Sequence, residues 1–572
     1  MQRATARQYA LLASLALLLA AALLQPIALT LRGGFAEDIV TREGFTLRHV
    51  ATVFRDPVTR EGLINALLIA SATTALATLI ALPLAYASAR YRYPLKGLWS
   101  AAVLAPLILP PFVGAIGVRA VLGRSGAVNA LLGSDLDILG AHRAWGVVVT
   151  LALNLYPIVY LNAVAALANL NASLDEAGRI FGASAWRRFF AITLPLIRPG
   201  LFAGGSIVFI WAFTELGTPL VFDYYAVTSV QIFNGIKKMD ASVEPYALTA
   251  VMLAFSVAMY ALGKVVLGRS GYATGGRAFV ASSERRLSPL PGAAVSLGFL
   301  AVCGLALIPH IGVTLTAFAK PGAWYRSVLP EAWTAHNVAE ALGHPLAFGA
   351  IRNSLLLAGA AAVVDVILGV AIGYLVARTR VRGRGVLDSL AMLPLAVPGL
   401  VLAFGYVAMS LNWPFGKGHP LEGWVDVVGA NPNPIPLLVI AYAVRRLPYV
   451  VRATVAGLQQ IPVELEEAAR TFGASALGAF RKAVLPLIAA NLLAGGLLAF
   501  SFAMLEVSDS LVLAQQEQHF PITKAIYSFA ERLGDGPGIA SGMGLWGMLL
   551  LATTLAGVSV LLGKKLGAVF RA

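Results

Sequence analysis

Five ionisable side chains interrupt stretches of sequence that are otherwise apolar. They are Glu215, Glu506, Asp365, Arg445 and Arg446. Within a bilayer each such charge costs about 2.5–3.5 kcal/mol to insert, so these residues are retained where they pair with one another or line a pathway. Their types suit ion pairing, gating or contact with a charged solute. We therefore take all five as candidates for a pathway or a gate.

Each of these candidates also has a purely structural interpretation. Glu215 and Glu506 could form an ion pair or hydrogen bond that fixes their helices in the bundle. For Arg445 and Arg446, reaching toward the membrane surface or pairing with Asp365 or another acid is favoured over contact with an anion. The sequence does not show which way these side chains face.

Two charged segments of similar sequence lie between apolar stretches. They read LDEAGRIFGASAWRRFFAITLPL at 174–196 and LEEAARTFGASALGAFRKAVLPL at 465–487. Acids near the start complement a helix dipole, and a central glycine, Gly182 or Gly473, can adopt the backbone angles that end a helix. Each segment is thus predicted to form a helix–turn–helix elbow. One copy would equally suit amphipathic helices on lipid headgroups, but two copies in register favour a shared docking task.

The composition places most of the chain in a membrane. Of its 572 residues, 58% are hydrophobic and 12% are charged, whereas soluble domains carry about 25% charged residues. A helix of roughly 20 apolar residues spans a bilayer. The predicted fold is an all-α membrane protein with about twelve spans, the first of them too long for a removable signal peptide. The spans are expected at 9–31, 62–89, 98–122, 144–170, 199–222, 246–263, 289–319, 353–377, 387–411, 434–458, 488–513 and 541–563.

The positive charge of the chain carries information about topology. The formal net charge is +15, but Lys and Arg are about twice as dense in the segments that alternate spans would place in the cytoplasm. This bias argues against nucleic-acid binding and predicts that both termini are cytoplasmic. One cysteine, Cys303, and seven scattered histidines give no disulfide framework and no metal site. No catalytic residue is predicted.

The chain consists of two similar halves. Asn65, Tyr86 and Arg90 recur 288 residues later, and the charged segments recur at an offset of 291. Six spans per half is an even number, so the halves have the same orientation, and a pathway would lie on the axis between them. The predicted divisions are 1–267 for the first half, 268–288 for a Gly/Ser-rich cytoplasmic linker, and 289–572 for the second half.

The repeated segments resemble the cytoplasmic signature of binding-protein-dependent ABC importer permeases. The matching positions are Glu176, Ala177, Gly182, Ile192 and Leu194-Pro195, and then Glu467, Ala468, Gly473 and Leu485-Pro486. Two positions depart from the pattern: Gly178 replaces an alanine and Ala483 replaces the isoleucine. With six spans in each half, the resemblance covers essentially the whole chain and implies the fold of a type I importer permease.

The resemblance implies a division of labour. In that family the elbow is a coupling helix that docks on a cytoplasmic ATPase, which implies two ATPase copies that use ATP and magnesium, and an external solute-binding protein. The chain itself contains no GxxxxGK[ST] phosphate loop, so it is expected to bind no cofactor and not to be an enzyme. The implied location is the bacterial inner membrane.

The substrate and one rival function stay open. Fusion of both halves and Glu-Leu-Gly-Thr-Pro at 215–219 look most like ferric-iron importers. Thiamine, aminoethylphosphonate, polyamine and sulfate permeases have a similar pattern. The rival is a secondary transporter driven by protons or sodium through Asp365 or Glu506, which does not account for the elbows. A membrane scaffold would not need paired acids within the membrane.

Overall fold

The computed structural model describes residues 6–38, 43–140, 143–168, 170, 172–238, 242–267, 284–429 and 432–562, and these are mostly helical. In the first half the elements are α1 (Ala6–Leu19), η1 (Ala20–Leu24), α2 (Gln25–Phe35), α3 (Arg48–Arg55), α4 (Pro57–Arg90), β1 (Tyr91–Arg92), α5 (Lys96–Ala102), η2 (Ala105–Ile108), α6 (Pro111–Leu122), α7 (Ala127–Leu132), α8 (Ala144–Ala168), α9 (Ala172–Ile180), α10 (Ala185–Arg188), η3 (Phe189–Thr193), α11 (Leu194–Phe213), α12 (Gly217–Val221), α13 (Thr228–Gly235), η4 (Ile236–Lys238) and α14 (Glu244–Leu267).

The second half repeats this order. Its elements are β2 (Arg285–Arg286), α15 (Pro289–Ala306), α16 (Ile308–Phe318), α17 (His336–Gly343), α18 (Pro345–Arg378), α19 (Arg384–Met392), η5 (Leu393–Leu395), α20 (Gly399–Ser410), α21 (Ile435–Gln459), α22 (Glu464–Thr471), α23 (Ala476–Ala479), η6 (Phe480–Val484), α24 (Leu485–Met504), α25 (Ser508–Leu513), η7 (Glu517–His519), α26 (Ile522–Ala530) and α27 (Gly536–Leu562).

All twelve expected spans fall on helical segments. Eight helical segments of the described chain are long and apolar enough to cross a membrane, or ten if each of two bent helix pairs is one span. The other two expected spans are α14, described as a shorter apolar helix over Glu244–Met259, and α21, which carries three arginines. The fold is thus the expected all-α membrane protein.

The third span of each half is bent rather than straight, which the sequence analysis did not predict. The segments on either side of the break meet at 97° in the first half and at 103° in the second. The breaks fall at Pro110-Pro111 and at Pro398-Gly399, because proline lacks a backbone donor and disfavours helix in the residue before it.

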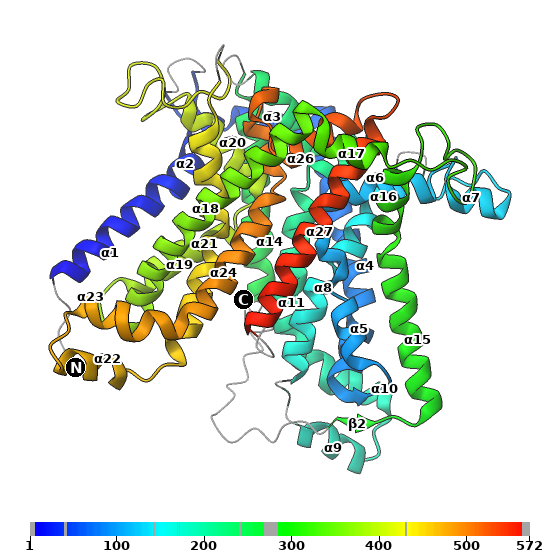
Figure 1. Ribbon diagram of the computed structural model, residues 1–572, viewed down its shortest axis with the longest axis horizontal. Helices are drawn as coiled ribbons and strands as arrows, with labels where there is room; N and C mark the ends of the chain where they lie inside the picture. The colour runs from blue at the N-terminus through cyan, green and yellow to red at the C-terminus, as the bar shows by residue number, and fades with distance from the viewer. Residues whose placement is uncertain are drawn as a thin grey trace.

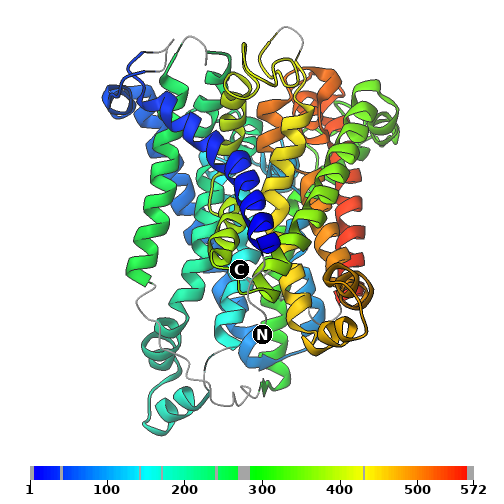
Figure 2. The ribbon, with the colours of Figure 1, turned by 90° about the vertical axis from the view of Figure 1, so that its left-hand side faces the viewer.

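The first span of each half packs against the other half. α2 contacts α20 of the second half, and α16 contacts α6 of the first; Figure 2 shows α1 and α2 crossing the second half diagonally. Two repeat-related glycines permit the crossings: a Cβ on Gly117 would lie 2.3 Å from the Pro309 carbonyl oxygen, and one on Gly405 would lie 2.8 Å from that of Pro26. The halves therefore interlock at close backbone contacts.

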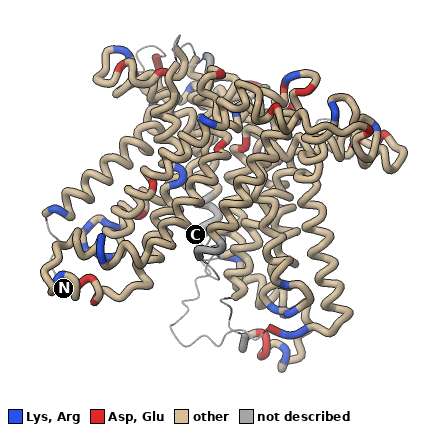
Figure 3. The backbone as a smooth tube through the Cα atoms, viewed as in Figure 1, with Lys and Arg blue, Asp and Glu red and all other residues tan. Residues whose placement is uncertain are grey.

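The two elbows lie at the same end of the molecule. α9 and α10 are on one side of that end and α22 and α23 on the other (Figure 1). The common end agrees with the expected parallel orientation of the repeats. Charged residues gather at this end and at the opposite one, with a few in the middle of the bundle (Figure 3).

The predicted linker, 268–288, lies outside the described residues except for 284–288. That end is fixed to the first half: β2 pairs in parallel with β1, and Glu284 accepts hydrogen bonds from Lys96 at 2.9 Å and Arg92 at 3.0 Å. The Lys96 ammonium, assisted by Arg92, holds the pKa of the Glu284 carboxyl below its usual range.

Candidate functional site

The first elbow has the predicted helix–turn–helix form. α9 ends at Ile180, and Gly182 takes a left-handed φ of +75°. The Ala183 amide donates to the Gly178 carbonyl at 2.9 Å, which is the closure that a glycine after a helix end permits. The Ser184 hydroxyl then accepts from the Arg187 amide at 3.3 Å and caps α10.

The second elbow repeats this geometry at equivalent residues. Gly473 has a φ of +89°, the Ala474 amide donates to the Ala469 carbonyl at 3.1 Å, and the Ser475 hydroxyl accepts from the Gly478 amide at 3.1 Å. At both corners a Cβ on the glycine would meet no atom within 4 Å. The corners are therefore held by backbone conformation and face open space.

The two departures from the family pattern lie at one packing contact. A Cβ on Gly178 would lie 2.9 Å from Ile192 Cδ1, so the glycine lets Ile192 in the second helical piece pack close to α9. The equivalent positions of the second half are Ala469 and Ala483. The first half thus has a glycine against an isoleucine, and the second half has alanine at both equivalent positions.

An aromatic residue projects at the corner of each elbow, which the sequence analysis missed. Phe181 is 88% exposed and Phe472 is 92% exposed, each directly before the corner glycine. Trp186 and Leu477, again repeat partners, are also exposed. Their identical spacing from the glycine was the signal available in the sequence. The predicted motif residues Glu176, Ala177, Glu467 and Ala468 lie on the same two elbows, with both glutamates exposed.

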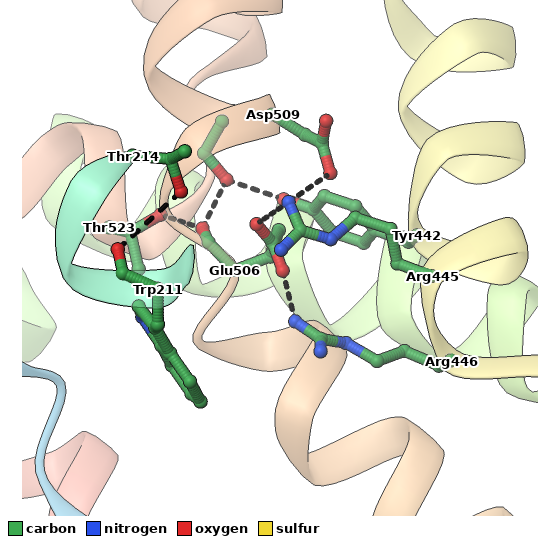
Figure 4. Close-up of polar contacts among 9 residues, drawn as sticks. Trp211, Thr214, Tyr442, Arg445, Arg446, Glu506, Asp509 and Thr523 are labelled. Atoms are coloured by element: carbon green, nitrogen blue, oxygen red, sulfur yellow. Dashed lines mark hydrogen bonds and ion pairs between the residues drawn. The ribbon is translucent and has the colours of Figure 1, made fainter. Parts of the chain in front are cut away.

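Inside the bundle the second half holds a cluster of four charges (Figure 4). Arg445 Nη1 lies 2.9 Å from Glu506 Oε1 and 3.5 Å from Asp509 Oδ2, and Arg446 Nη2 contacts Glu506 Oε2. All four side chains are largely buried. Two positive and two negative charges offset one another, which is how buried charges are tolerated. Asp509, one helical turn after Glu506, was missed by the sequence analysis.

The structure answers how the arginines are paired. Arg445 pairs with Glu506 and Asp509, and Arg446 pairs with Glu506. The alternative of pairing with another acid is therefore confirmed, and among the described residues neither arginine forms an ion pair with Asp365. Asp365 is fully buried in α18, and within the described chain neither of its carboxylate oxygens has a hydrogen-bond partner. α18 packs against α21, the helix that carries the arginines.

The first half has the same framework without the cluster. Glu215 Oε1 accepts from the amide and the hydroxyl of Thr218 in α12, both at 3.1 Å. The repeat partners of Arg445, Arg446 and Asp509 are Asn154, Leu155 and Thr218.

Asn154 and Arg445 both contact the break in the third span of their own half. Asn154 Nδ2 donates to the carbonyls of Pro106 and Leu109 at 2.7 and 2.9 Å. Arg445 Nη1 lies only 2.0 Å from where a Cβ on Gly399 would be. Each half therefore uses this position to satisfy or contact its bent span.

Glu215 lies in the turn after α11 and Glu506 in the turn after α24. These two turns, here called the acidic corners, meet between the halves. A Cβ on Gly217, two residues after Glu215, would lie 3.2 Å from Cγ1 of Val507, the residue directly after Glu506. The Glu506 carbonyl accepts hydrogen bonds from Ser510 and Thr523, each at 2.6 Å. The candidate pathway residues therefore gather at the interface of the repeats, apart from Asp365. Among the described residues no group of three His, Cys, Asp or Glu could hold a metal ion.

Comparison with known proteins decides the family. The sequence pattern of the family described as binding-protein-dependent transport system inner membrane component matches residues 77–270 and again residues 369–562. The chain belongs to this family. Each match runs from the second span through the elbow to the sixth span, so the internal duplication and the resemblance are confirmed.

The relatives of this chain are named for transport of different substrates. The ferric transport system permease protein of Actinobacillus pleuropneumoniae is 28% identical over 420 residues, 71% of this chain and 58% of that protein. The sulfate transport system permease of Salmonella typhimurium is 30% identical over 241 residues, 41% of this chain and 79% of its own. The molybdenum transport system permease of Escherichia coli is 32% identical over 162 residues, covering 28% and 71%. This chain spans 58–63% of the length of the ferric-type relatives.

Proposed function

We propose that this chain is the permease subunit of an ATP-driven importer and forms the pathway between its two halves. The observation that carries the proposal is the pair of equivalent elbows at one end of the molecule, each with an exposed aromatic residue beside a left-handed glycine. Two copies of a cytoplasmic ATPase would dock there and use ATP and magnesium. A solute-binding protein would deliver the substrate at the opposite end, and both termini would lie in the cytoplasm. The chain itself would be neither an enzyme nor a nucleic-acid binder.

Each elbow is continuous with a helix that reaches the centre of the molecule. Through η3 and η6 the elbows lead into α11 and α24, which have 20 residues each and so are about 30 Å long. α11 ends next to Glu215 and α24 next to Glu506. Movement of the elbows by closing ATPase subunits would therefore displace the two acidic corners and change the contact between the halves. Glu215, Glu506, Arg445 and Arg446 are the gate residues of this proposal.

Ferric iron is the substrate we propose first. The ferric-type relative from A. pleuropneumoniae matches over 420 residues, whereas the sulfate and molybdenum relatives match over 241 and 162 residues. Iron would pass as cargo and would not be a resident ligand. Sulfate, molybdate, thiamine, aminoethylphosphonate and polyamines are the alternatives.

An ion-coupled secondary transporter is supported less well. A carrier that takes up and releases a proton or sodium ion at Glu506 would have to break its contacts with two arginines. Among the described residues Asp365 forms no such ion pair, and it lies within α18, whereas Glu215 and Glu506 lie in the turns that follow α11 and α24. Neither residue gives a reason for the two exposed elbows.

If the elbows dock on the ATPase, then a negative charge in place of the exposed phenylalanine of each elbow should prevent docking. Replacing Phe181→Asp and Phe472→Asp together should abolish co-purification of the ATPase partner, because each buried phenylalanine contributes about 1.5–3 kcal/mol to an interface. The measurement is the ATPase-to-permease ratio after affinity purification, expected to fall from two to near zero. Leu132→Asp with Leu329→Asp, exposed at the opposite end, is the matched control. Retention of two ATPase subunits by the double phenylalanine variant would argue against docking at these tips.

A further inference from the structure

The second elbow is tied to a long membrane helix by one short hydrogen bond. The Tyr374 hydroxyl, near the end of α18, donates to Glu466 Oε1 in α22 at 2.6 Å. Glu466 is 6% exposed, and a hydrogen bond to a carboxylate is about twice as strong as one between neutral groups. Arg378, one helical turn further, donates to the carbonyls of Leu458 and Ile461 at 2.9 and 2.8 Å. α18 thus holds both α22 and the chain leading into it.

The first half carries the same two residue types but pairs the acid differently. Tyr86 and Asp175 are the repeat partners of Tyr374 and Glu466. Asp175 Oδ1 instead accepts from Arg188 Nε at 3.0 Å, and Arg188 Nη1 also donates to the Ala183 carbonyl at 2.7 Å. This pair joins the two helices of the elbow to each other. The residue equivalent to Arg188 in the second half is Ala479, so the second helix of that elbow has no arginine at this position.

The aromatic contact at this position is common to both halves. The Tyr86 ring meets Phe189 edge-on at 5.4 Å, and the Tyr374 ring meets Phe480 edge-on at 5.2 Å. The tyrosines therefore occupy equivalent places against equivalent neighbours. The difference between the halves lies in the partner of the acid, which is the membrane helix in one half and the elbow itself in the other.

We propose that Tyr374 is a positioning residue, and that because of it the two elbows pass the movement of the ATPase subunits to the membrane helices unequally. Resting on the proposed function, the proposal is that the second elbow moves together with α18, whereas the first elbow, closed by Asp175 and Arg188, pivots against α4. Because the two tyrosine–phenylalanine contacts are alike, the asymmetry lies in the partner of the acid, which is Tyr374 for Glu466 and Arg188 for Asp175.

α18, the helix that binds the second elbow through Tyr374, also packs against the helix that carries the arginines of the charge cluster. α18 packs closely on α21: Cβ atoms on Gly369 and Gly373 would lie 2.7 Å from Val450 Cγ1 and 2.6 Å from Thr454 Cγ2. α21 carries Arg445 and Arg446, which bind Glu506. A continuous set of packed elements therefore joins the second elbow to the acidic corner of its half, which is the kind of physical network that carries coupling.

A matched pair of variants tests the asymmetry. Tyr374→Phe removes the hydroxyl and keeps the ring, and Tyr86→Phe makes the same change in the first half. In the complete complex in liposomes, we expect the solute moved per ATP hydrolysed to fall several-fold in Tyr374→Phe and to stay at the wild-type value in Tyr86→Phe. Ala479→Arg, which offers Glu466 a guanidinium within the elbow, should reproduce the Tyr374→Phe effect.

A second readout does not depend on the ATPase. In the detergent-solubilised chain alone, amide hydrogen exchange in Glu464–Thr471 should accelerate about tenfold in Tyr374→Phe, while exchange in Ala172–Ile180 should be unchanged in Tyr86→Phe. Equal effects of the two tyrosine variants on either measurement would overturn the asymmetry. Faster exchange with an unchanged solute-to-ATP ratio would overturn transmission through Tyr374. A chain that binds no ATPase at all would refute the proposed function, and the exchange result would still decide whether the tether exists.

Discussion

Replacing Glu506 with glutamine is expected to destabilise the protein by about 3–5 kcal/mol, the cost of removing one partner from a buried ion pair. Glu506 meets both Arg445 and Arg446 at its two carboxylate oxygens. A neutral amide would leave two largely buried guanidinium groups to share Asp509. The measurement is the free energy of unfolding, or the unfolding temperature, of the purified chain in detergent.

Glu215→Gln provides the control for this prediction. Its amide oxygen can still accept from Thr218, so the expected loss is about 1 kcal/mol or less. A further variant removes the four charges together: Glu506→Gln with Arg445→Asn, Arg446→Leu and Asp509→Thr installs the residues that the first half uses at the last three positions. It should recover most of the stability. Equal destabilisation by Glu506→Gln and Glu215→Gln would show that the cluster does not stabilise the second half.

Substituting valine at both elbow glycines is the second change with a large expected effect. Gly182 and Gly473 have φ values of +75° and +89°, and a residue with a Cβ pays roughly 1–2 kcal/mol in this region, with a branched side chain at the upper end. Since each corner faces open space, the chain should still fold and insert. The distorted corners should no longer fit a partner, so solute uptake should fall at least tenfold while the amount of chain in the membrane stays the same.

Gly97→Val with Gly385→Val is the matched control for the elbow variant. These glycines are also repeat partners, lie at the starts of α5 and α19, and face open space without a left-handed φ. Uptake should be close to the wild-type value in this control. Undiminished uptake in Gly182→Val/Gly473→Val would exclude the elbows as the coupling elements.

The elbows could be predicted because their form is encoded locally. Acids at a helix start, a glycine at the corner and a proline after it act on neighbouring backbone, and the second copy shows which of these residues are shared. The parallel arrangement of the halves followed in the same way from counting apolar stretches. The bends at Pro110 and Pro398 were encoded locally too, yet the apolar runs around them look continuous.

The pairing of the intramembrane charges could not be predicted, because it depends on how helices face one another. Asp365 and the arginines of α21 lie in adjacent helices, and their opposite charges alone would make them suitable partners. The rotation of α21 instead turns Arg445 and Arg446 toward Glu506 and Asp509. The Tyr374–Glu466 bond has the same origin, since its two residues are 92 positions apart and become neighbours only when α22 folds back against α18.

Solute uptake by proteoliposomes tests the central claim most directly. The chain would be reconstituted with its ATPase and with a binding protein loaded with ferric iron, and in parallel with sulfate or molybdate binding proteins as probes of the other substrate classes. We expect uptake of one of these solutes that requires both ATP and its binding protein and stops when either is omitted. Uptake by the chain alone, driven by a proton or sodium gradient without ATP, would contradict the account.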